Sequence, residues 1–510
     1  MKSKIVIGLI SIMGICLFVS CEKFLEEKTP GIETTNGYYT TVANIQTAAN
    51  ACYTVLRSGQ AYRNDLGKIL ETRHNDIVVG PNAALRSELL TLYTYSLSST
   101  TGSYEGTWSV YYSGISHCNA AIDFVKNEPI GVDKTTAPRV IAQAYCLRAL
   151  YYFDLVRIYG EVPLRLKFTS DASSLDMPKS TIDQIYSSII SDLKYACGET
   201  SENPGLPVVY ENGGDNNGRA TLGFAQALLA KVYLFRKDWN NAAKYTDMVI
   251  KSGKYALWPN FKDYFYIKNK NQPNSAPLGE AVFEAQLNND LGDGNYYTTW
   301  CLPVRSAIPP TSLGWDGAWG QGDWVAKADL YRSYEKGDER RMYTFLSDTF
   351  PDNNANGGKG GYSKVDLDTA TYRYIYKYRL DDQTTPWGNN MSNIPIIRYS
   401  DVLLMYAEAL NEGGTQGTLT QYAAINLVRS RAKISPLIGL TKDAFREAVY
   451  KERRLEFVFE FQRFYDLQRT GRLIAAIQDR VPGFKDGMEY IPIPQSELDV
   501  NKKMVQNPAW

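Results

Sequence analysis

A run of apolar residues from Phe445 to Leu467 is the longest feature in the hydrophobic pattern of this chain. Its apolar positions wrap most of a helix circumference, and no glycine or proline interrupts the segment before Gly471. This pattern predicts one long buried helix over residues 446–472. The apolar positions are Phe445, Val449, Leu455, Val458, Phe459, Phe461, Phe464 and Leu467.

Charged residues lie between these apolar positions, and a buried helix tolerates charge only where opposite charges pair. The spacing of three residues places Arg453 beside Glu456 and makes a row of neighbours from Glu460 through Arg463 and Asp466 to Arg469. We therefore expect an ion network along the helix. Glu456 and Glu460 also have the spacing of a general acid and base, but the neighbouring arginines would lower both pKa values, which favours the structural interpretation.

Other amphipathic segments predict pairs of helices. The segment 219–255 has the pattern of a helix, a short turn at Lys237–Trp239 and a second helix. Parts of this pattern recur at 143–164, 396–432 and 446–472. A coincidental helix bundle is the alternative, but four occurrences of the pattern, the first included, favour stacked helical hairpins. The positions in the first pair that match a tetratricopeptide repeat are Leu229, Ala230, Tyr233 and Ala242.

Strand patterns are sparse. Residues 281–287 and 371–379 have the β-branched, aromatic or alternating composition of strands. Two long irregular tracts, 288–324 and 350–371, separate the helical segments, and tracts of this length in a compact domain are usually functional or mobile. The sequence thus predicts an all-α fold of tetratricopeptide-like helix pairs with long irregular loops and a few short strands.

Three motifs in the carboxy-terminal part resemble the SusD/RagB family of surface nutrient-binding lipoproteins of Bacteroidetes. They are IIRYSDVLLMYAEALNE at 396–412, ERRLEFVFEFQRFYDLQRTG at 452–471 and EYIPIPQSELDVNKKMVQNPAW at 489–510. The helical segment 143–164 extends the similarity toward the amino terminus. This resemblance implies one SusD-like body over residues 21–510. Its tetratricopeptide-like helices would occupy about 21–270, and its family motifs about 271–510.

The resemblance also implies a function. Proteins of this family act as lids on a SusC-like TonB-dependent outer-membrane transporter, to which they deliver captured oligosaccharide or polysaccharide. Family ligand-binding residues lie in variable loops outside the motifs, so none can be assigned here by matching. A RagB-like member that binds peptide or protein is the alternative within the family.

The first twenty residues have the layout of a secretory signal. Lys2 and Lys4 precede an apolar run that is too short to span a membrane, and Ser20 precedes Cys21 as a lipoprotein signal peptidase requires. We expect residues 1–20 to be removed and Cys21 to carry acyl chains, which anchor the mature protein to the outer membrane at the cell surface. The other cysteines, apart from Cys16 in the signal, are odd in number and without CxxC spacing, which is typical of buried thiols.

Composition narrows the choice of ligand. The 55 basic and 55 acidic side chains balance, which argues against nucleic acid, whereas the 13% aromatic share exceeds what helix cores usually need. Four tryptophans fall in the glycine- and aspartate-rich segment 295–324, and flat aromatic faces beside short polar side chains suit sugars. Each indole could instead hold its loop on the body, but we expect at least one to be exposed. Our candidate ligand-binding residues are Trp315, Trp319, Trp300, Trp324, Tyr296, Tyr297, Asn75 and Asp76.

Enzymatic and metal-dependent functions have weaker support. A helical glycoside hydrolase would need two facing carboxylates, and the candidates in or near the tryptophan-rich segment are Asp290, Asp293, Asp316 and Asp323. Residues from Asp352 onward fit the first half of a calcium loop, but Ser363 stands where the bidentate glutamate belongs. Nothing places the two histidines, His74 and His117, as a metal pair. We expect a binding protein without catalytic residues, cofactor or metal.

Overall fold

The protein is represented by a computed structural model. It describes residues 41–80, 86–127, 136–169, 171, 176–200, 203–210, 217–288, 294–302, 321–346, 349–352, 361–364, 372–379 and 390–510. Cys21 and the segment 1–20, which we predict to be a signal, lie outside these ranges. One hydrophobic cluster extends from Ala48 to Met504 and joins the amino- and carboxy-terminal parts of the described chain.

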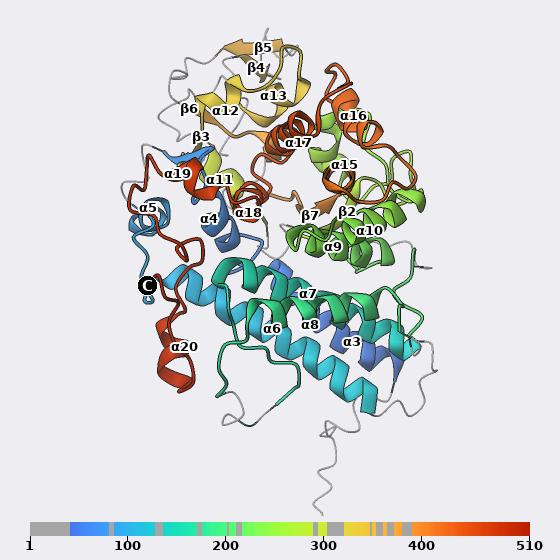
Figure 1. The fold of residues 1–510 in the computed structure, drawn as a ribbon, viewed down its shortest axis with the longest axis vertical. Helices are drawn as coiled ribbons and strands as arrows, with labels where there is room; N and C mark the ends of the chain where they lie inside the picture. The colour runs from blue at the N-terminus through green and yellow to red at the C-terminus, as the bar shows by residue number, and fades with distance from the viewer. Residues whose placement is uncertain are drawn as a thin grey trace, which may run out of the picture.

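Helices from the first part of the chain form the lower half of the molecule in Figure 1. Helix α6 packs on α7, α7 packs on α8, and α3 packs on both α6 and α7. Helix α7 ends just before Gly160, whose φ of +76° is readily adopted by glycine. These helices are α3 (Val42–Cys52), α6 (Gly102–Asn127), α7 (Thr136–Tyr159) and α8 (Ile182–Ala196).

Two helical hairpins stack above this group. Thr221, Asp238 and Thr420 each accept a hydrogen bond from a backbone N–H in the first turn of the helix that follows, so three of the four helices begin with a side-chain cap. Lys237 turns the chain between the first pair with a φ of +59°. The predicted stacked hairpins are confirmed, with α10 packed on α15. They are α9 (Leu222–Phe235) with α10 (Trp239–Lys251), and α15 (Tyr399–Glu412) with α16 (Gln421–Arg431).

The long helix predicted over residues 446–472 is interrupted, so that prediction is wrong. The segment forms α17 (Lys442–Glu456) and α18 (Arg463–Arg469). Between them Phe459 and Phe461 adopt left-handed conformations, with φ of +61° and +62°. Such φ values are rare for aromatic residues and end the helical hydrogen-bond ladder.

Buried donors from distant parts of the chain explain the break. Lys377 Nζ donates to the Val458 carbonyl oxygen at 2.9 Å, and Tyr378 OH donates to the Phe459 carbonyl oxygen at 2.9 Å. Glu71 accepts from the Phe461 N–H at 2.8 Å. These three side chains satisfy backbone groups that lie outside a regular helix. No local pattern in the segment predicts these distant partners.

The predicted ion network exists, but most of its partners come from other elements. Asp466 and Arg469 pair at 2.8 Å as expected. Arg453 pairs instead with Asp401 at 2.7 Å and with Asp466, whereas Arg463 contacts Asp76 at 3.0 Å. The residue spacing within one helix therefore predicted that an ion network exists. It predicted few of the pairs in that network.

Glu456 lies at the centre of this network. Its carboxylate contacts Arg398 at 2.8 Å, Arg340 at 3.2 Å and Arg431. Burial alone would raise the pKa of Glu456, but Arg431, Arg398 and Arg340 outweigh burial and hold this pKa below its usual range. A carboxyl group kept ionised in this way does not serve as a general acid, which supports the structural interpretation of Glu456 and Glu460.

Three small sheets accompany the helices in the described ranges. β1 (Ile77–Val79), β3 (Trp324–Lys327) and β6 (Tyr372–Tyr374) form an antiparallel sheet in the order β1-β3-β6. β2 (Ala281–Ala285) pairs antiparallel with β7 (Ile394–Arg398) through an irregular register, and β4 (Thr349–Asp352) pairs with β5 (Gly361–Lys364). The strand expected at 281–287 is confirmed, whereas the strand expected at 371–379 is shorter and gives way to the 3₁₀ helix η11 (Lys377–Arg379).

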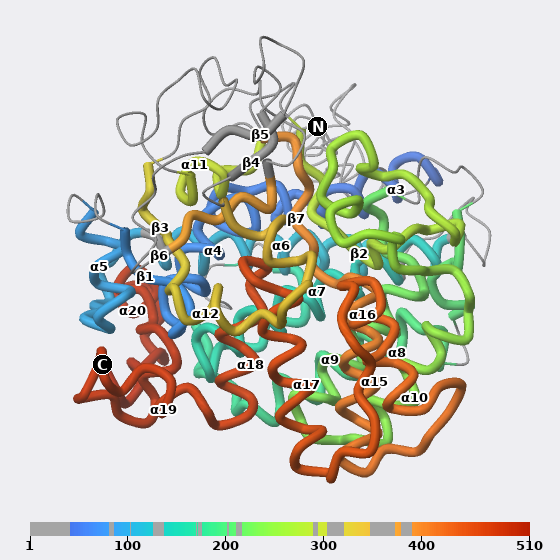
Figure 2. Tube along the Cα trace, turned by 90° about the horizontal axis from the view of Figure 1, so that it is seen from above, coloured from blue at the N-terminus to red at the C-terminus, as the bar shows by residue number. Residues whose placement is uncertain are grey.

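Short elements fill the spaces between the helical pairs. In Figure 2 the β1-β3-β6 sheet and strand β2 lie on different sides of the body. The short helices are η3 (Tyr53–Arg57), α4 (Asp65–Glu71), α5 (Ser87–Thr94), η7 (Phe261–Phe265), η8 (Ile267–Asn269), α11 (Tyr297–Cys301), α12 (Ala328–Arg332), α13 (Glu339–Thr344), α19 (Leu473–Ile477) and α20 (Gln495–Val500).

The last residues of the chain return to the first helices. Ile491 N–H donates to the Ile158 carbonyl at 2.9 Å, and Gln495 N–H donates to the Ser99 carbonyl at 2.8 Å. Within the described ranges, none of the helices has the length and hydropathy needed to cross a bilayer. Cys52, Cys118, Cys146 and Cys301 are buried free thiols, as expected, and Cys197 is a partly buried free thiol.

Replacing Glu456 by glutamine should destabilise the protein strongly. The substitution leaves three buried arginines short of one counter-charge, and breaking a buried ion pair typically costs about 3–5 kcal/mol. Denaturant titration measures the change in unfolding free energy. Glu447→Gln is the matched control, because its salt bridge to Arg472 is exposed and such pairs contribute less than about 1 kcal/mol. Equal losses in the two variants would contradict a central role for the buried network.

Candidate functional site

Two of the tryptophan-rich segment's candidate residues are fully buried. Tyr297, in α11, and Trp324, in β3, have 0% of their surface exposed. Trp324 Nε1 donates to Thr72 Oγ1 at 3.1 Å, and its ring centroid lies 5.5 Å from that of Phe459. Because a covered ring offers no face to a sugar, the expectation that Tyr297 and Trp324 stack on ligand is corrected in this conformation: both pack the segment onto the body.

Trp300 and Tyr296 lie nearer the surface. Trp300 is 8% exposed, donates from Nε1 to Asn64 Oδ1 at 2.8 Å, and has the Arg86 guanidinium carbon 4.8 Å from its ring centroid. Tyr296 is half-buried, and the guanidinium carbon of Arg63 lies 5.1 Å from its ring centroid. Cations already occupy these ring faces, which limits the area left for a ligand. Trp315 and Trp319 lie outside the described residues.

Asp76 has a structural position rather than an open one. It is 3% exposed, accepts from Arg454 Nε at 2.9 Å and contacts Arg463 Nε at 3.0 Å. Its carbonyl accepts from the Lys327 N–H at 2.8 Å, which ties β1 to the end of β3. The carboxylate expected to contact ligand is therefore already paired. Asn75, half-buried beside it, accepts weakly from Arg463 at 3.4 Å.

Electrostatics agree with this role of Asp76. Burial alone would raise its pKa, but Arg463 and Arg454 outweigh burial and lower the pKa to about 2. The aspartate therefore stays charged over the physiological range and holds two arginines of the carboxy-terminal helices against β1.

The residues that flank segments 81–85 and 303–320 hydrogen-bond to one another. Gly80 N–H donates to the Asp323 carbonyl at 2.7 Å, and Gly322 N–H donates to the Leu302 carbonyl at 2.8 Å. Arg86 Nε contacts the Asp323 carboxylate at 2.7 Å. Burial raises the pKa of Asp323 even though Arg86 opposes the shift. These flanking residues meet beside Trp300. The points at which the two segments join the described body are therefore neighbours.

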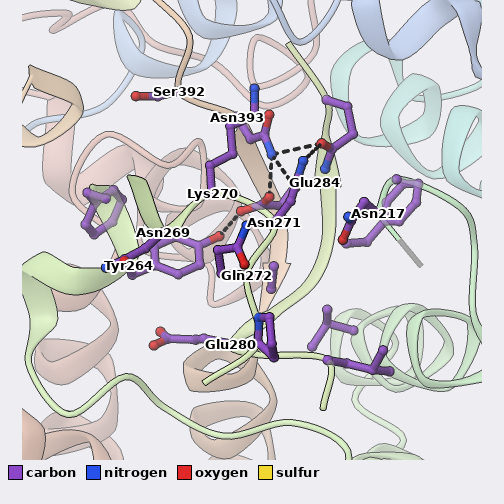
Figure 3. A pocket seen from close by; sticks show the side chains of 18 of the residues that line it. Asn217, Tyr264, Asn269, Lys270, Asn271, Gln272, Glu280, Glu284, Ser392 and Asn393 are labelled. Carbon is purple, nitrogen blue, oxygen red and sulfur yellow. Dashed lines mark hydrogen bonds between the residues drawn. The ribbon is translucent and has the colours of Figure 1, made fainter. Parts of the chain in front are cut away.

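A cavity among the described residues lies elsewhere, beside β2. It has a volume of about 290 Å³, at the lower end of the range for small-molecule sites. Figure 3 shows Asn271, Glu284 and Asn393 meeting in one part of it, with Asn217 on the side away from Tyr264. Its polar and aromatic lining consists of Asn217, Arg219, Trp258, Tyr264, Phe265, Tyr266, Asn269, Lys270, Asn271, Gln272, Glu280, Phe283, Glu284, Gln286, Tyr378, Ser392 and Asn393.

Hydrogen bonds fix the polar wall of this cavity. Asn393 Nδ2 donates to Glu284 Oε2 at 2.8 Å, to Asn271 Oδ1 at 3.1 Å and to Gln286 Oε1 at 3.1 Å. Tyr264 OH donates to Glu284 Oε1 at 2.5 Å. Burial raises the pKa of Glu284, although its two hydrogen bonds favour the charged form. The wall is thus preorganised, with amide groups beside aromatic rings.

No pattern in the sequence predicts this cavity. Its lining comes from residues 217–219, 258–286, 378 and 392–393, which are distant along the chain. The stretch WPNFKDYFYIKNKNQPN at 258–274 nevertheless combines aromatic residues with asparagine and proline, as the tryptophan-rich segment does. By composition, residues 258–274 are thus as good a candidate for ligand binding as the tryptophan-rich segment.

A metal site and a carboxylate pair for hydrolysis find no support in the described ranges. No group of three or more histidine, cysteine or acidic residues there could hold a metal ion. Among the hydrolase candidates Asp323 pairs with Arg86, and Asp290, Asp293 and Asp316 lie outside the described residues. Ser363 belongs to β5, and Asn354 and Asn356 of the candidate calcium loop lie outside those residues.

Comparison with known proteins gives matches along most of the chain. A family model described as the SusD family matches residues 253–510, and one described as starch-binding and associating with the outer membrane matches residues 23–234. SusD-like protein P2 of Formosa agariphila is 27% identical, with 95% of each chain covered.

Solved structures are also similar. A laminarin-binding SusD-like protein has 28% identity and a TM-score of 0.72, with 92% of this chain and 99% of that chain covered. Surface glycan-binding protein A from Bacteroides thetaiotaomicron, in complex with laminarihexaose, has 25% identity and a TM-score of 0.73, with 91% and 99% covered. The fold is therefore shared over nearly the whole length of each chain.

The pairing of Asp76 predicts a loss of stability in acid. Its pKa is lower in the folded protein than the ordinary value of 3.8, so its contribution is present above about pH 4 and is lost as the pH falls through about 2. The shift corresponds to about 2 kcal/mol. In denaturant titrations between pH 4 and pH 2, Asp76→Asn should therefore show a shallower decline of unfolding free energy than the unmodified protein. Asp183→Asn, in an exposed pair with Arg236, should keep the full decline. An unchanged slope in Asp76→Asn would contradict this account.

Proposed function

Because this chain belongs to the SusD family, we propose that it is a cell-surface glycan-binding lipoprotein. It captures oligosaccharide or polysaccharide and delivers it to a SusC-like TonB-dependent transporter in the outer membrane. The observation that carries the proposal is the similarity, over more than nine-tenths of this chain, to solved SusD-like proteins whose names record binding of laminarin or laminarihexaose.

We place the main glycan site at the tryptophan-rich segment, with Trp315 and Trp319 as its stacking residues. Support comes from the described residues around it. Trp300 stands where residues flanking 81–85 and 303–320 meet, and Trp324 is anchored in β3. In this proposal Trp315 and Trp319 bind the glycan, while Trp300 and Trp324 hold the base of the segment on the body. A preorganised aromatic face lowers the entropy cost of binding a flexible glycan.

The function is binding rather than hydrolysis. Asp323 pairs with Arg86, and the Glu456 carboxylate is held ionised in a buried network. Neither carboxylate is therefore placed as a general acid. Cys21 supplies the anchor in this proposal, since several acyl chains together hold a protein at a bilayer where one would not. Delivery to a transporter follows from the family, and the second family model is described by its association with the outer membrane.

Loss of one stacking contact should weaken glycan binding without unfolding the protein. Trp315→Ala or Trp319→Ala should lower the affinity for the cognate glycan about fivefold to a hundredfold, because stacking on one aromatic ring is worth roughly 1–3 kcal/mol. Calorimetric titration with laminarihexaose and maltohexaose, beside thermal unfolding, measures both quantities.

Trp324→Ala provides the contrast. Its ring is fully buried, so truncation should cost about 3–5 kcal/mol of stability. Full affinity in the Trp315→Ala/Trp319→Ala double variant would reject the segment as the binding face, as would a large drop in its melting temperature. A protein that binds peptides but none of the glycans tested would support a RagB-like function instead.

Cys21→Ala should release the protein from the membrane. Without the acylated cysteine, the variant should move to the soluble fraction and intact cells should lose its surface labelling, whereas the unmodified protein should co-purify with a large β-barrel after extraction in mild detergent. Cys197→Ala, at a partly buried thiol in the body, is the control and should keep both properties. Membrane retention of Cys21→Ala would contradict the lipid anchor, and a protein that always runs alone would contradict stable pairing with a transporter.

A further inference from the structure

We propose that the cavity beside β2 is a second binding site, specific for a neutral sugar or for the end of a neutral glycan chain. Its volume of about 290 Å³ suits a ligand of one or two sugar rings rather than a long chain. The site is separate from the tryptophan-rich segment, and its existence does not depend on where the main glycan site lies.

The ionic groups of the cavity are already engaged, which favours an uncharged ligand. Glu280 accepts from Arg398 and Arg431 at 2.7 Å each, and Glu284 accepts from Tyr264 and Asn393. Lys270 Nζ donates to the Met391 carbonyl at 2.9 Å and to the Leu287 carbonyl. Arg219 Nη1 donates to Asn50 at 2.9 Å. A charged ligand would have to displace these partners or bury an unpaired charge, both of which are costly.

Trp258 supplies an aromatic wall of the right kind. It is half-buried, lines the cavity, and has no ring or cation contact within the part of the chain that the structure describes. Its backbone N–H donates to Glu280 Oε2 at 2.8 Å, so the buried ion network fixes the position of the residue. An indole that is anchored through its backbone and lacks a packed partner for its ring suits the apolar face of a sugar.

Amide side chains provide the polar contacts that a sugar requires. Gln272 is exposed at the rim, and Asn217 lies on the opposite side of the view from Tyr264 in Figure 3. Gln286 accepts from both Asn271 and Asn393 through Oε1, which orients its amide group within the wall. Amides donate and accept at once, as sugar hydroxyls do, so a neutral carbohydrate matches this wall better than an ion does.

A short segment connects the cavity with the tryptophan-rich region. Asn295 and Asn390 pair through their backbones, with the Asn295 N–H donating to the Asn390 carbonyl at 2.7 Å. Three residues later Asn393 forms the polar wall of the cavity, and Asn295 Nδ2 donates to the Ser392 carbonyl at 3.1 Å. Residues 390–393 therefore link the start of the tryptophan-rich segment to the polar wall of the cavity.

Fluorine NMR on the full mature chain labelled with 5-fluorotryptophan tests the proposal. Trp258→Phe assigns the Trp258 signal among those of the nine tryptophans. The probes are glucose, galactose, mannose, xylose, arabinose, N-acetylglucosamine, maltose and laminaribiose at millimolar concentration, with neutral acetyl-trialanine amide and glucose 6-phosphate for comparison. We expect at least one neutral sugar to shift the Trp258 signal saturably, with no saturable shift from the phosphate. Saturation by the peptide alone, or by none of the sugars, would overturn the proposal.

Variants separate this cavity from the main site. For the sugar that responds, saturation-transfer NMR should show a dissociation constant raised at least about fivefold in Trp258→Ala and less in Trp258→Phe, which keeps an aromatic face. Trp239→Ala, at a half-buried tryptophan outside the cavity, should leave it unchanged. The Trp258 response should persist in Trp315→Ala/Trp319→Ala, where the main site is disabled. Its loss in that double variant, or unchanged affinity in Trp258→Ala, would reject a separate second site.

Discussion

Pairing of buried charge is the constraint on which the rest of this structure depends. Arg398, at the end of β7, is 1% exposed and contacts Glu280, Glu456 and Glu460 at 2.7–2.8 Å. The cost of burying each charge is offset only when all partners are in place, and these partners come from segments nearly two hundred residues apart. A partly assembled network would leave unpaired charge in the core. Docking of the carboxy-terminal helices onto β2 and β7 must therefore be nearly complete before it is favourable.

Both proposed binding regions depend on this constraint. Glu280 uses one carboxylate oxygen for Arg398 and Arg431 and the other for the Trp258 backbone, so the network determines where the cavity's indole stands. On the other side of the body, Asp76 pairs with Arg454 and Arg463 and ties β1 to β3, beside the base of the tryptophan-rich segment. A rigid ionic core thus supports both the cavity beside β2 and the base of the tryptophan-rich segment.

Sequence reasoning succeeded where the determining interactions are local. The pairs α9–α10 and α15–α16 follow from apolar periodicity and caps within a few residues. It failed where distant side chains determine the backbone conformation. Lys377 and Tyr378 donate hydrogen bonds to carbonyl oxygens of the segment between α17 and α18, and no residue within that segment indicates the break. Strands of three residues such as β1 are too short to show alternation. The cavity beside β2 joins four separate parts of the chain that only the fold brings together.

Tryptophan illustrates why composition alone cannot identify a sugar-binding residue. Trp324 lies in glycine-rich sequence, yet its indole Nε1–H donates a hydrogen bond to Thr72. Its ring packs on Phe459 and has no exposed surface. Trp258 follows a helix in a less unusual sequence, yet its ring lines a cavity and has no described ring or cation partner. A sugar competes with internal contacts for the face of an indole, so the residue best placed to bind is one whose backbone is fixed while its ring is not satisfied. That property belongs to the folded environment: Glu280 fixes the Trp258 backbone, and the ring of Trp258 has no described aromatic or cationic partner.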